Sequence, residues 1–82
     1  MQSEQIKQMI EQGLAGARVS VSGDGQHFDA IVVSEAFANK TMVQQHQLVY
    51  KTLGDKMRGE IHALSLRTYT PEQWTEQRIG AG

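Results

Sequence analysis

The 82-residue sequence contains no cysteine, and this absence removes several functional classes at once. The chain forms no disulfide framework, has no C-x-x-C redox centre and supplies no thiolate to a metal. Such a composition fits a reducing compartment. The polar start MQSEQIKQMI, with acidic Glu4, indicates neither a signal peptide nor a transit peptide. A cytoplasmic protein is therefore expected.

Three further absences narrow the function. No apolar run approaches the roughly 20 residues that a membrane span needs. Eight Lys and Arg against nine Asp and Glu give a net charge of −1, so no overall field attracts nucleic acid or a membrane surface. No serine stands in a G-x-S-x-G pattern, and an enzyme is not expected. The length suffices for one hydrophobic core, and a single binding domain over 1–82 is predicted.

The pattern of apolar residues predicts an α+β fold in the order α-β-β-α-β-α. The predicted elements are a helix over 3–15, strands over 17–22 and 27–33, a helix over 43–57, a strand over 60–67, and a short helix that begins at Pro71 and frays over 79–82. Ser3 is the expected N-cap of the first helix, and Thr70 opens a T-x-x-Q capping box for the last. The apolar stripe of the middle helix is predicted to comprise Val43, His46, Val49, Tyr50, Leu53 and Met57.

The order of strands predicts how two histidines meet. The GDGQ turn makes an antiparallel hairpin, whereas the helical crossover between 27–33 and 60–67 favours a parallel pair. The result is a three-stranded mixed sheet with helices packed mainly on one face. Parallel neighbours start at the same edge, so His27 and His62 are expected to flank one exposed end of the sheet.

From the sequence pattern alone, each histidine has a plain alternative. His62 fits a polar residue at a strand end, His27 a loop residue, and His46 a packed residue in the core helix. Their spacing matches no zinc motif. Lys40, Lys51 and Arg58 fit a solvated helix face, and nucleic-acid binding is the alternative.

Four segments in this order and spacing, SGDGQHF, VVSEAF, QHQLVY and IHALSLRTYTPEQW, resemble the BolA family along nearly the whole chain. The short, cysteine-free hairpin loop is most similar to the IbaG-like, acid-stress branch of that family. The resemblance implies a fold similar to class II KH domains. It also places His62, in I-H-A, at the position of the family's signature histidine.

The resemblance further implies a partner, a monothiol glutaredoxin with a CGFS motif. In the implied heterodimer a 2Fe-2S cluster is shared: glutaredoxin and glutathione supply thiolates, while this chain supplies His62 and, from its hairpin, His27. Neutral imidazole in place of thiolate raises the reduction potential of such a cluster and makes its ligation sensitive to acid. The isolated chain would be a monomer without a cofactor.

The sequence leaves two other roles open. The chain could dock on glutaredoxin through Arg67, Tyr69 and Trp74 without ligating a cluster. It could also be a DNA-binding transcriptional regulator that uses Lys40, Lys51 and Arg58. Against DNA binding, the stretch 38–41 lacks the glycines with which a KH loop clamps a nucleic-acid backbone.

Overall fold

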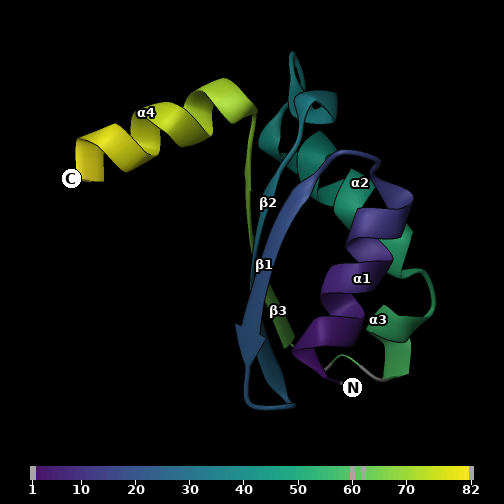
Figure 1. The fold of residues 1–82 in the computed structure, drawn as a ribbon. Coiled ribbons are helices and arrows are strands. Elements are labelled where there is room, and N and C mark those ends of the chain that lie inside the picture. The colour runs from purple at the N-terminus through teal and green to yellow at the C-terminus, as the bar shows by residue number, and fades with distance from the viewer. Residues whose placement is uncertain (1, 60, 62, 82) are drawn as a thin grey trace.

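A computed structural model describes residues 2–59, 61 and 63–81 (Figure 1). Its elements confirm the predicted order and add a short helix before the last strand. They are α1 (Ser3–Gly13), β1 (Arg18–Gly23), β2 (His27–Val33), a 3-10 turn η1 (Glu35–Phe37), α2 (Met42–Leu53), α3 (Lys56–Gly59), β3 (Ala63–Tyr69) and α4 (Pro71–Ala81). Gly54, with φ of 54°, separates α2 from α3, because a residue without Cβ adopts this left-handed backbone at little cost.

The three strands form one mixed sheet in the order β1-β2-β3. The hairpin pairs β1 with β2 antiparallel, and β2 pairs with β3 parallel, as the crossover predicted. β2 is therefore the central strand, and its run of apolar residues fits that position. The sequence placed the last strand at 60–67, whereas the strand extends over Ala63–Tyr69.

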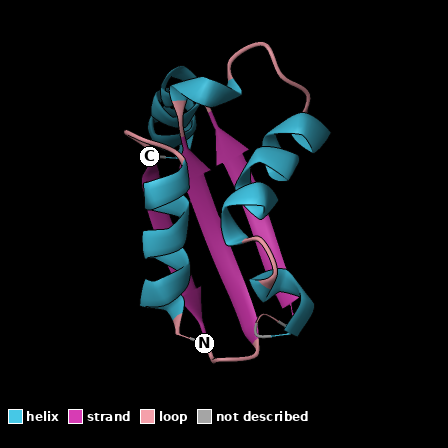
Figure 2. Ribbon diagram, turned by 90° about the vertical axis from the view of Figure 1, so that its right-hand side faces the viewer, coloured by secondary structure: helices cyan, strands magenta, loops and turns pink. Residues whose placement is uncertain are grey.

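Helices α1, α2 and α3 cover one face of the sheet, while α4 projects from the other side (Figures 1 and 2). One hydrophobic cluster joins the helices to the sheet. Its buried members are Ile6, Ile10, Val19, Phe28, Val32, Phe37, Val49, Leu53 and Ile61. No helix in the described part of the chain combines the length and apolar character needed to cross a membrane.

Helix α2 is rotated relative to the predicted stripe. Val49 and Leu53 are buried as predicted, but Val43 is 65% exposed and Tyr50 is 38% exposed, so these two predictions are wrong. Gln45 is buried in their place. The reason is that the Gln45 side chain donates to two main-chain carbonyls in the segment before the helix, which a hydrophobic pattern cannot reveal.

The helix ends show where capping chemistry was predictable. Thr70 and Gln73 form the expected box: Thr70 Oγ1 accepts from the Gln73 N–H, and Gln73 Oε1 accepts from the Thr70 N–H. The N-cap of α1 is Gln2 rather than Ser3, and its N–H donates to Gln5 Oε1 at 2.8 Å. Helix α4 extends through Ala81, into the 79–82 tail, where fraying stays a prediction.

Candidate functional site

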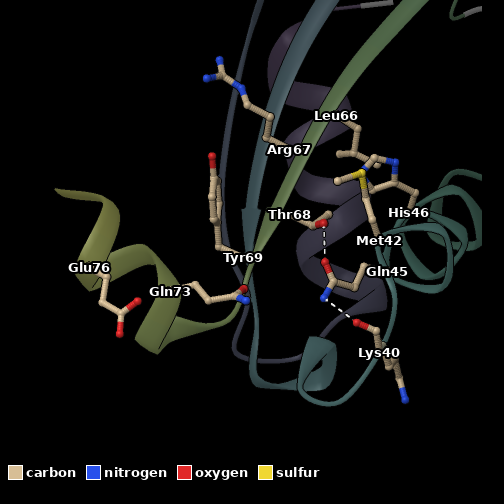
Figure 3. Close-up of a pocket in the computed structure, with 10 residues that line it drawn as sticks. All are labelled: Lys40, Met42, Gln45, His46, Leu66, Arg67, Thr68, Tyr69, Gln73 and Glu76. Atoms are coloured by element: carbon tan, nitrogen blue, oxygen red, sulfur yellow. Dashed lines mark hydrogen bonds between the residues drawn. The ribbon is translucent and has the colours of Figure 1, made fainter. Parts of the chain in front are cut away.

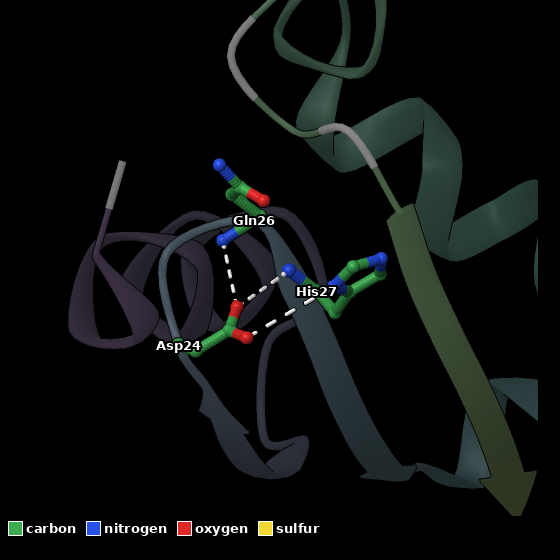
Figure 4. A network of polar contacts seen from close by, with 3 residues as sticks. All are labelled: Asp24, Gln26 and His27. Carbon is green, nitrogen blue, oxygen red and sulfur yellow. Dashed lines mark hydrogen bonds and ion pairs between the residues drawn. The ribbon is translucent and has the colours of Figure 1, made fainter.

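The loop that presents His27 is organised by the Asp24 side chain (Figure 4). Asp24 Oδ1 accepts hydrogen bonds from the Gln26 and His27 N–H groups, each at 2.9 Å. Gly25, with φ of 100°, takes the left-handed turn conformation. Asp24 Oδ2 also lies 3.9 Å from His27 Nδ1. The loop therefore fixes the main chain at the start of β2 while the His27 side chain stays 74% exposed.

The two parallel strands start side by side, as predicted. His27 is in register with Ala63, and the Ala63 N–H donates to the Gln26 carbonyl at 3.2 Å. The His27 ring is directed toward the side on which β3 begins (Figure 4). His62 lies outside the described residues, so its predicted role as a ligand stays a prediction. What the structure establishes is that the neighbour of His62 in the chain is paired with His27.

This end of the sheet offers an exposed imidazole to a partner. A metal centre normally needs four ligands, and the described residues contain no group of three or more His, Cys, Asp or Glu side chains arranged for a metal ion. His27 can therefore contribute one nitrogen, and the remaining ligands must come from elsewhere.

The loop should respond to strong acid through Asp24. The hydrogen bond from the His27 N–H, followed by that from Gln26, holds the pKa of Asp24 below its ordinary value of 3.8. A carboxyl with a lowered folded pKa stabilises the fold above its unfolded pKa, and this contribution is lost as the pH falls through the folded value. We expect the Gln26 and His27 amide resonances to titrate with a midpoint below 3.8, and Asp24→Asn to abolish that titration. A midpoint at or above the ordinary value would contradict the assigned hydrogen bonds.

The predicted docking residues lie toward the opposite end of β3. Arg67 is exposed, and Tyr69 and Trp74 are half-buried. The rings of Tyr69 and Trp74 approach to 5.4 Å between centroids at a tilt of 48°. From Ala63 to Tyr69 the strand advances roughly 20 Å. The structure thus brings Tyr69 and Trp74 together but separates them from His27 by the length of the sheet.

A groove with a volume of about 940 Å³ lies beside this end of β3 (Figure 3). Its walls come from α2, α4 and the loop before α2, and β3 lies along it. The lining residues are Lys40, Met42, Gln45, His46, Leu66, Arg67, Thr68, Tyr69, Gln73 and Glu76. Arg67 was predicted as a partner contact and Lys40 as a nucleic-acid contact, and both belong to this one groove.

Gln45 joins α2 and the segment before it to β3, and no pattern in the sequence predicted this role. Its Nε2 donates to the carbonyls of Phe37 at 3.0 Å and Lys40 at 3.1 Å, and its Oε1 accepts from Thr68 Oγ1 at 2.6 Å. Figure 3 shows the chain of contacts from the loop before α2, through Gln45, to β3. All polar atoms of this buried amide are therefore engaged across three segments.

His46 occupies the rim of the groove rather than the core. The sequence predicted a packed residue of the core helix, but the side chain is half-buried and lines the groove. Its ring meets Tyr50 edge-on, with centroids 6.4 Å apart and an angle of 78°. The rotation of α2 that exposes Tyr50 also moves His46 outward, so the prediction is wrong in its degree of burial.

Two of the three predicted nucleic-acid contacts line one depression beside α2. Lys40 and Lys51 line this second depression, with a volume of about 620 Å³, together with Gln44, Gln47, Leu48 and Tyr50. The Arg58 side chain lies outside the described residues. Asn39 has φ of 63°, a left-handed conformation that asparagine adopts more readily than most residues other than glycine. This surface carries two described cations and neutral polar or apolar neighbours.

Comparison with known proteins identifies similar chains. A model of the BolA-like protein family matches residues 4–73. The chain is 37% identical over 79 residues to the Acid stress protein IbaG of Escherichia coli strain K12, covering 95% of this chain and 94% of that protein. It is 42% identical over 55 residues to the DNA-binding transcriptional regulator BolA of Haemophilus influenzae, covering 67% of this chain and 53% of the regulator.

A solved structure of similar fold is that of a BolA protein homologue from Coxiella burnetii. It matches with a TM-score of 0.84 and 47% sequence identity, covering 92% of this chain and 97% of the homologue. The three-stranded mixed sheet with its covering helices is therefore an arrangement that a similar sequence also adopts.

Proposed function

Because the chain belongs to the BolA-like family, we propose that it is the partner of a CGFS-type monothiol glutaredoxin and contributes histidine ligands to a bridged 2Fe-2S cluster. The role is that of a cytoplasmic binding partner in iron–sulfur trafficking or in the response to iron or acid stress, and not that of an enzyme. The isolated chain carries no cluster, because it supplies only part of the ligand set.

The observation that carries this proposal is the register of the two parallel strands. His27 stands opposite Ala63, which directly follows His62 in the sequence. The His27 imidazole is exposed on a loop whose main chain Asp24 fixes, so a partner can reach the ring without unfolding the loop. Two histidines from one end of the sheet, His27 and His62, would then serve a single site.

The donor set fits a shared cluster. The chain has no cysteine and can offer imidazole nitrogen but not thiolate. Thiolates must come from the glutaredoxin and its glutathione, and the site is complete only in the heterodimer. A cluster held partly by neutral imidazoles has a higher reduction potential than one held by thiolates alone. His27 and His62 must each be deprotonated to bind, which couples binding to pH.

Docking would extend from the His27 end along the sheet toward Arg67, Tyr69 and Trp74. Arg67 and Tyr69 alternate with Leu66 and Thr68 along β3 and lie on the face away from α2 (Figure 3). Tyr69 and Trp74 form an aromatic pair, the type of rigid contact that protein interfaces favour. A partner seated on this face could contact the pair and approach His27 together.

The test mixes the chain with a cluster-loaded monothiol glutaredoxin and records visible absorption and circular dichroism. We expect new visible bands that grow with added chain and saturate at equimolar ratio, because exchange of ligands changes the electronic environment of the iron. Binding without a spectral change would support docking alone and contradict ligation. The absence of binding would contradict the partnership itself.

A second candidate is a DNA-binding regulator, favoured by Lys40, in the loop before α2, and Lys51, on α2, which line the same depression. Two cations provide a small electrostatic contribution, and the chain as a whole has a net charge of −1. DNA binding that weakens steeply with salt, and that weakens further when Lys40 and Lys51 are replaced by glutamine, would favour this role over the first.

A further inference from the structure

Strand β3 is an edge strand with hydrogen-bonding groups that face away from the sheet. No strand among the described residues lies beyond β3. The Ala63 N–H donates to Gln26, and the Tyr69 carbonyl accepts from the Ser34 N–H at 3.0 Å, so both of these residues face β2. Main-chain groups alternate in direction along a parallel strand. The N–H and C=O groups of Leu64, Leu66 and Thr68 therefore point to the open edge.

The groove beside β3 follows this open edge. Four consecutive residues, 66–69, line it. Successive side chains of a strand point to opposite faces, so a groove lined by all four must lie along the edge itself. Met42 and His46 of α2 form one wall, and Gln73 and Glu76 of α4 form the other (Figure 3). The unpaired edge is thus the floor of a channel between two helices.

The chemistry of this channel favours an extended polypeptide over a nucleic acid. The edge presents donors and acceptors in equal number, which match another extended peptide, whereas a phosphodiester chain offers only acceptors. The charged lining comprises Lys40 and Arg67 against Glu76, which is a weak field for a polyanion. Asn39 carries a Cβ at the loop position where a nucleic-acid clamp would need glycine.

The side chains of the channel indicate what an extended segment would carry. On the α2 side, Met42 is 68% exposed and Leu66 lies beside it, an apolar surface. On the opposite face Arg67 is exposed. Alternate residues of a bound strand would meet these two sides in turn. We propose that the β3 edge binds an extended segment of a partner protein with apolar residues toward Met42 and Leu66 and an acidic residue toward Arg67.

The proposal does not depend on the cluster, so it is tested on the chain alone. The probe is an acetylated, amidated peptide of about seven alternating valines and glutamates, long enough to span the edge. Binding should slow hydrogen exchange of the Leu64, Leu66 and Thr68 amides and leave Ser65 and Arg67 unchanged. Two N-methylated forms of the probe, one methylated on every valine and one on every glutamate, give the sharpest comparison. Only one set of amides faces β3, so one form should lose at least about tenfold in affinity and the other should bind normally.

A charge exchange tests the orientation of the segment. Arg67→Glu should lower the affinity for the valine–glutamate probe at least about tenfold, because the new carboxylate repels the glutamates. The same variant should bind the corresponding valine–lysine peptide more tightly, because the charges are then opposite. Arg18→Glu is the matched control, because Arg18 is also exposed but lies on β1, at the other edge of the sheet. Equal binding of both N-methylated forms would overturn the proposal. Protection of the edge amides that rises with the concentration of the chain alone would also overturn the proposal, because a second copy would then occupy the edge. Stronger protection by single-stranded DNA than by the peptide would overturn it as well.

Discussion

Replacing Gln45 with alanine is expected to lower the free energy of unfolding by about 3 kcal/mol, because it leaves the Phe37 and Lys40 carbonyls and the Thr68 hydroxyl without their partner. Gln45 is only 8% exposed, and water replaces it poorly at this depth. Urea denaturation measures the change. For a small domain with a stability of about 5–15 kcal/mol, this is a large fraction of the total.

The control for Gln45 is its neighbour on the other side of the helix. Gln47 is exposed on α2, and Gln47→Ala should change stability by less than about 0.5 kcal/mol. Thr68→Val removes one hydrogen bond of the network, and its effect should not add fully to that of Gln45→Ala, since the two residues share a contact. A Gln45→Ala variant as stable as Gln47→Ala would contradict the proposed network.

Replacing His62 with alanine is expected to weaken formation of the cluster-bridged complex by more than about 100-fold. Loss of groups that only orient a metal ligand already costs about 10–100-fold, and loss of a direct ligand should cost more. His27→Ala should also weaken the complex and alter its visible spectrum, since His27 is proposed as the companion ligand. Titration of cluster-loaded glutaredoxin, followed by circular dichroism, measures both variants.

Gln26→Ala is the matched control for the hairpin histidine. Gln26 precedes His27 and contributes its main-chain N–H to Asp24 and its carbonyl to Ala63, and neither contact involves its side chain. This variant should form the complex as the parent chain does. If Gln26→Ala and His27→Ala behave alike, loop geometry rather than ligation explains the effect. If His62→Ala retains the full spectral change, His62 is not a ligand.

The sequence was sufficient where structure depends on local chemistry. The GDGQ segment predicted the hairpin because Asp24 and Gly25 suit a tight turn on their own. Thr70 and Gln73 predicted the start of α4 because a capping box is complete within four residues. A helical crossover between two strands favours parallel pairing, and this alone predicted that β3 starts beside His27, without any knowledge of side-chain packing.

The sequence-based predictions were wrong where contacts with a distant segment decide which residues are buried. Gln45 is buried because Phe37, Lys40 and Thr68 surround it, and a polar residue at that position reads as exposed in a hydrophobic pattern. One local signal was missed: Thr41 and Gln44 form the same T-x-x-Q box at the start of α2. Recognising it fixes where the helix begins, but the rotation of its buried face still depends on the sheet beneath it.

The groove could not be predicted from the sequence for a related reason. Lys40 precedes α2, Arg67 lies on β3 and Glu76 on α4, and only the packing of α2 and α4 on either side of the β3 edge brings them together. Sequence reasoning assigned Lys40 to DNA, as part of a loose basic cluster around the core helix, and Arg67 to a protein partner, as part of the last strand and helix. Their shared groove indicates a single surface.

The most direct test of cluster ligation by this chain detects its nitrogen atoms at the iron. The chain is labelled with ¹⁵N-histidine, combined with unlabelled cluster-loaded monothiol glutaredoxin and reduced, and pulsed electron paramagnetic resonance then measures hyperfine couplings. Because only this chain is labelled, any strongly coupled ¹⁵N nucleus must belong to one of its histidines. We expect such couplings, with loss of one of them in His27→Ala. A bridged complex whose reduced cluster shows no ¹⁵N coupling would contradict the account, because all of its ligands would then come from glutaredoxin and glutathione.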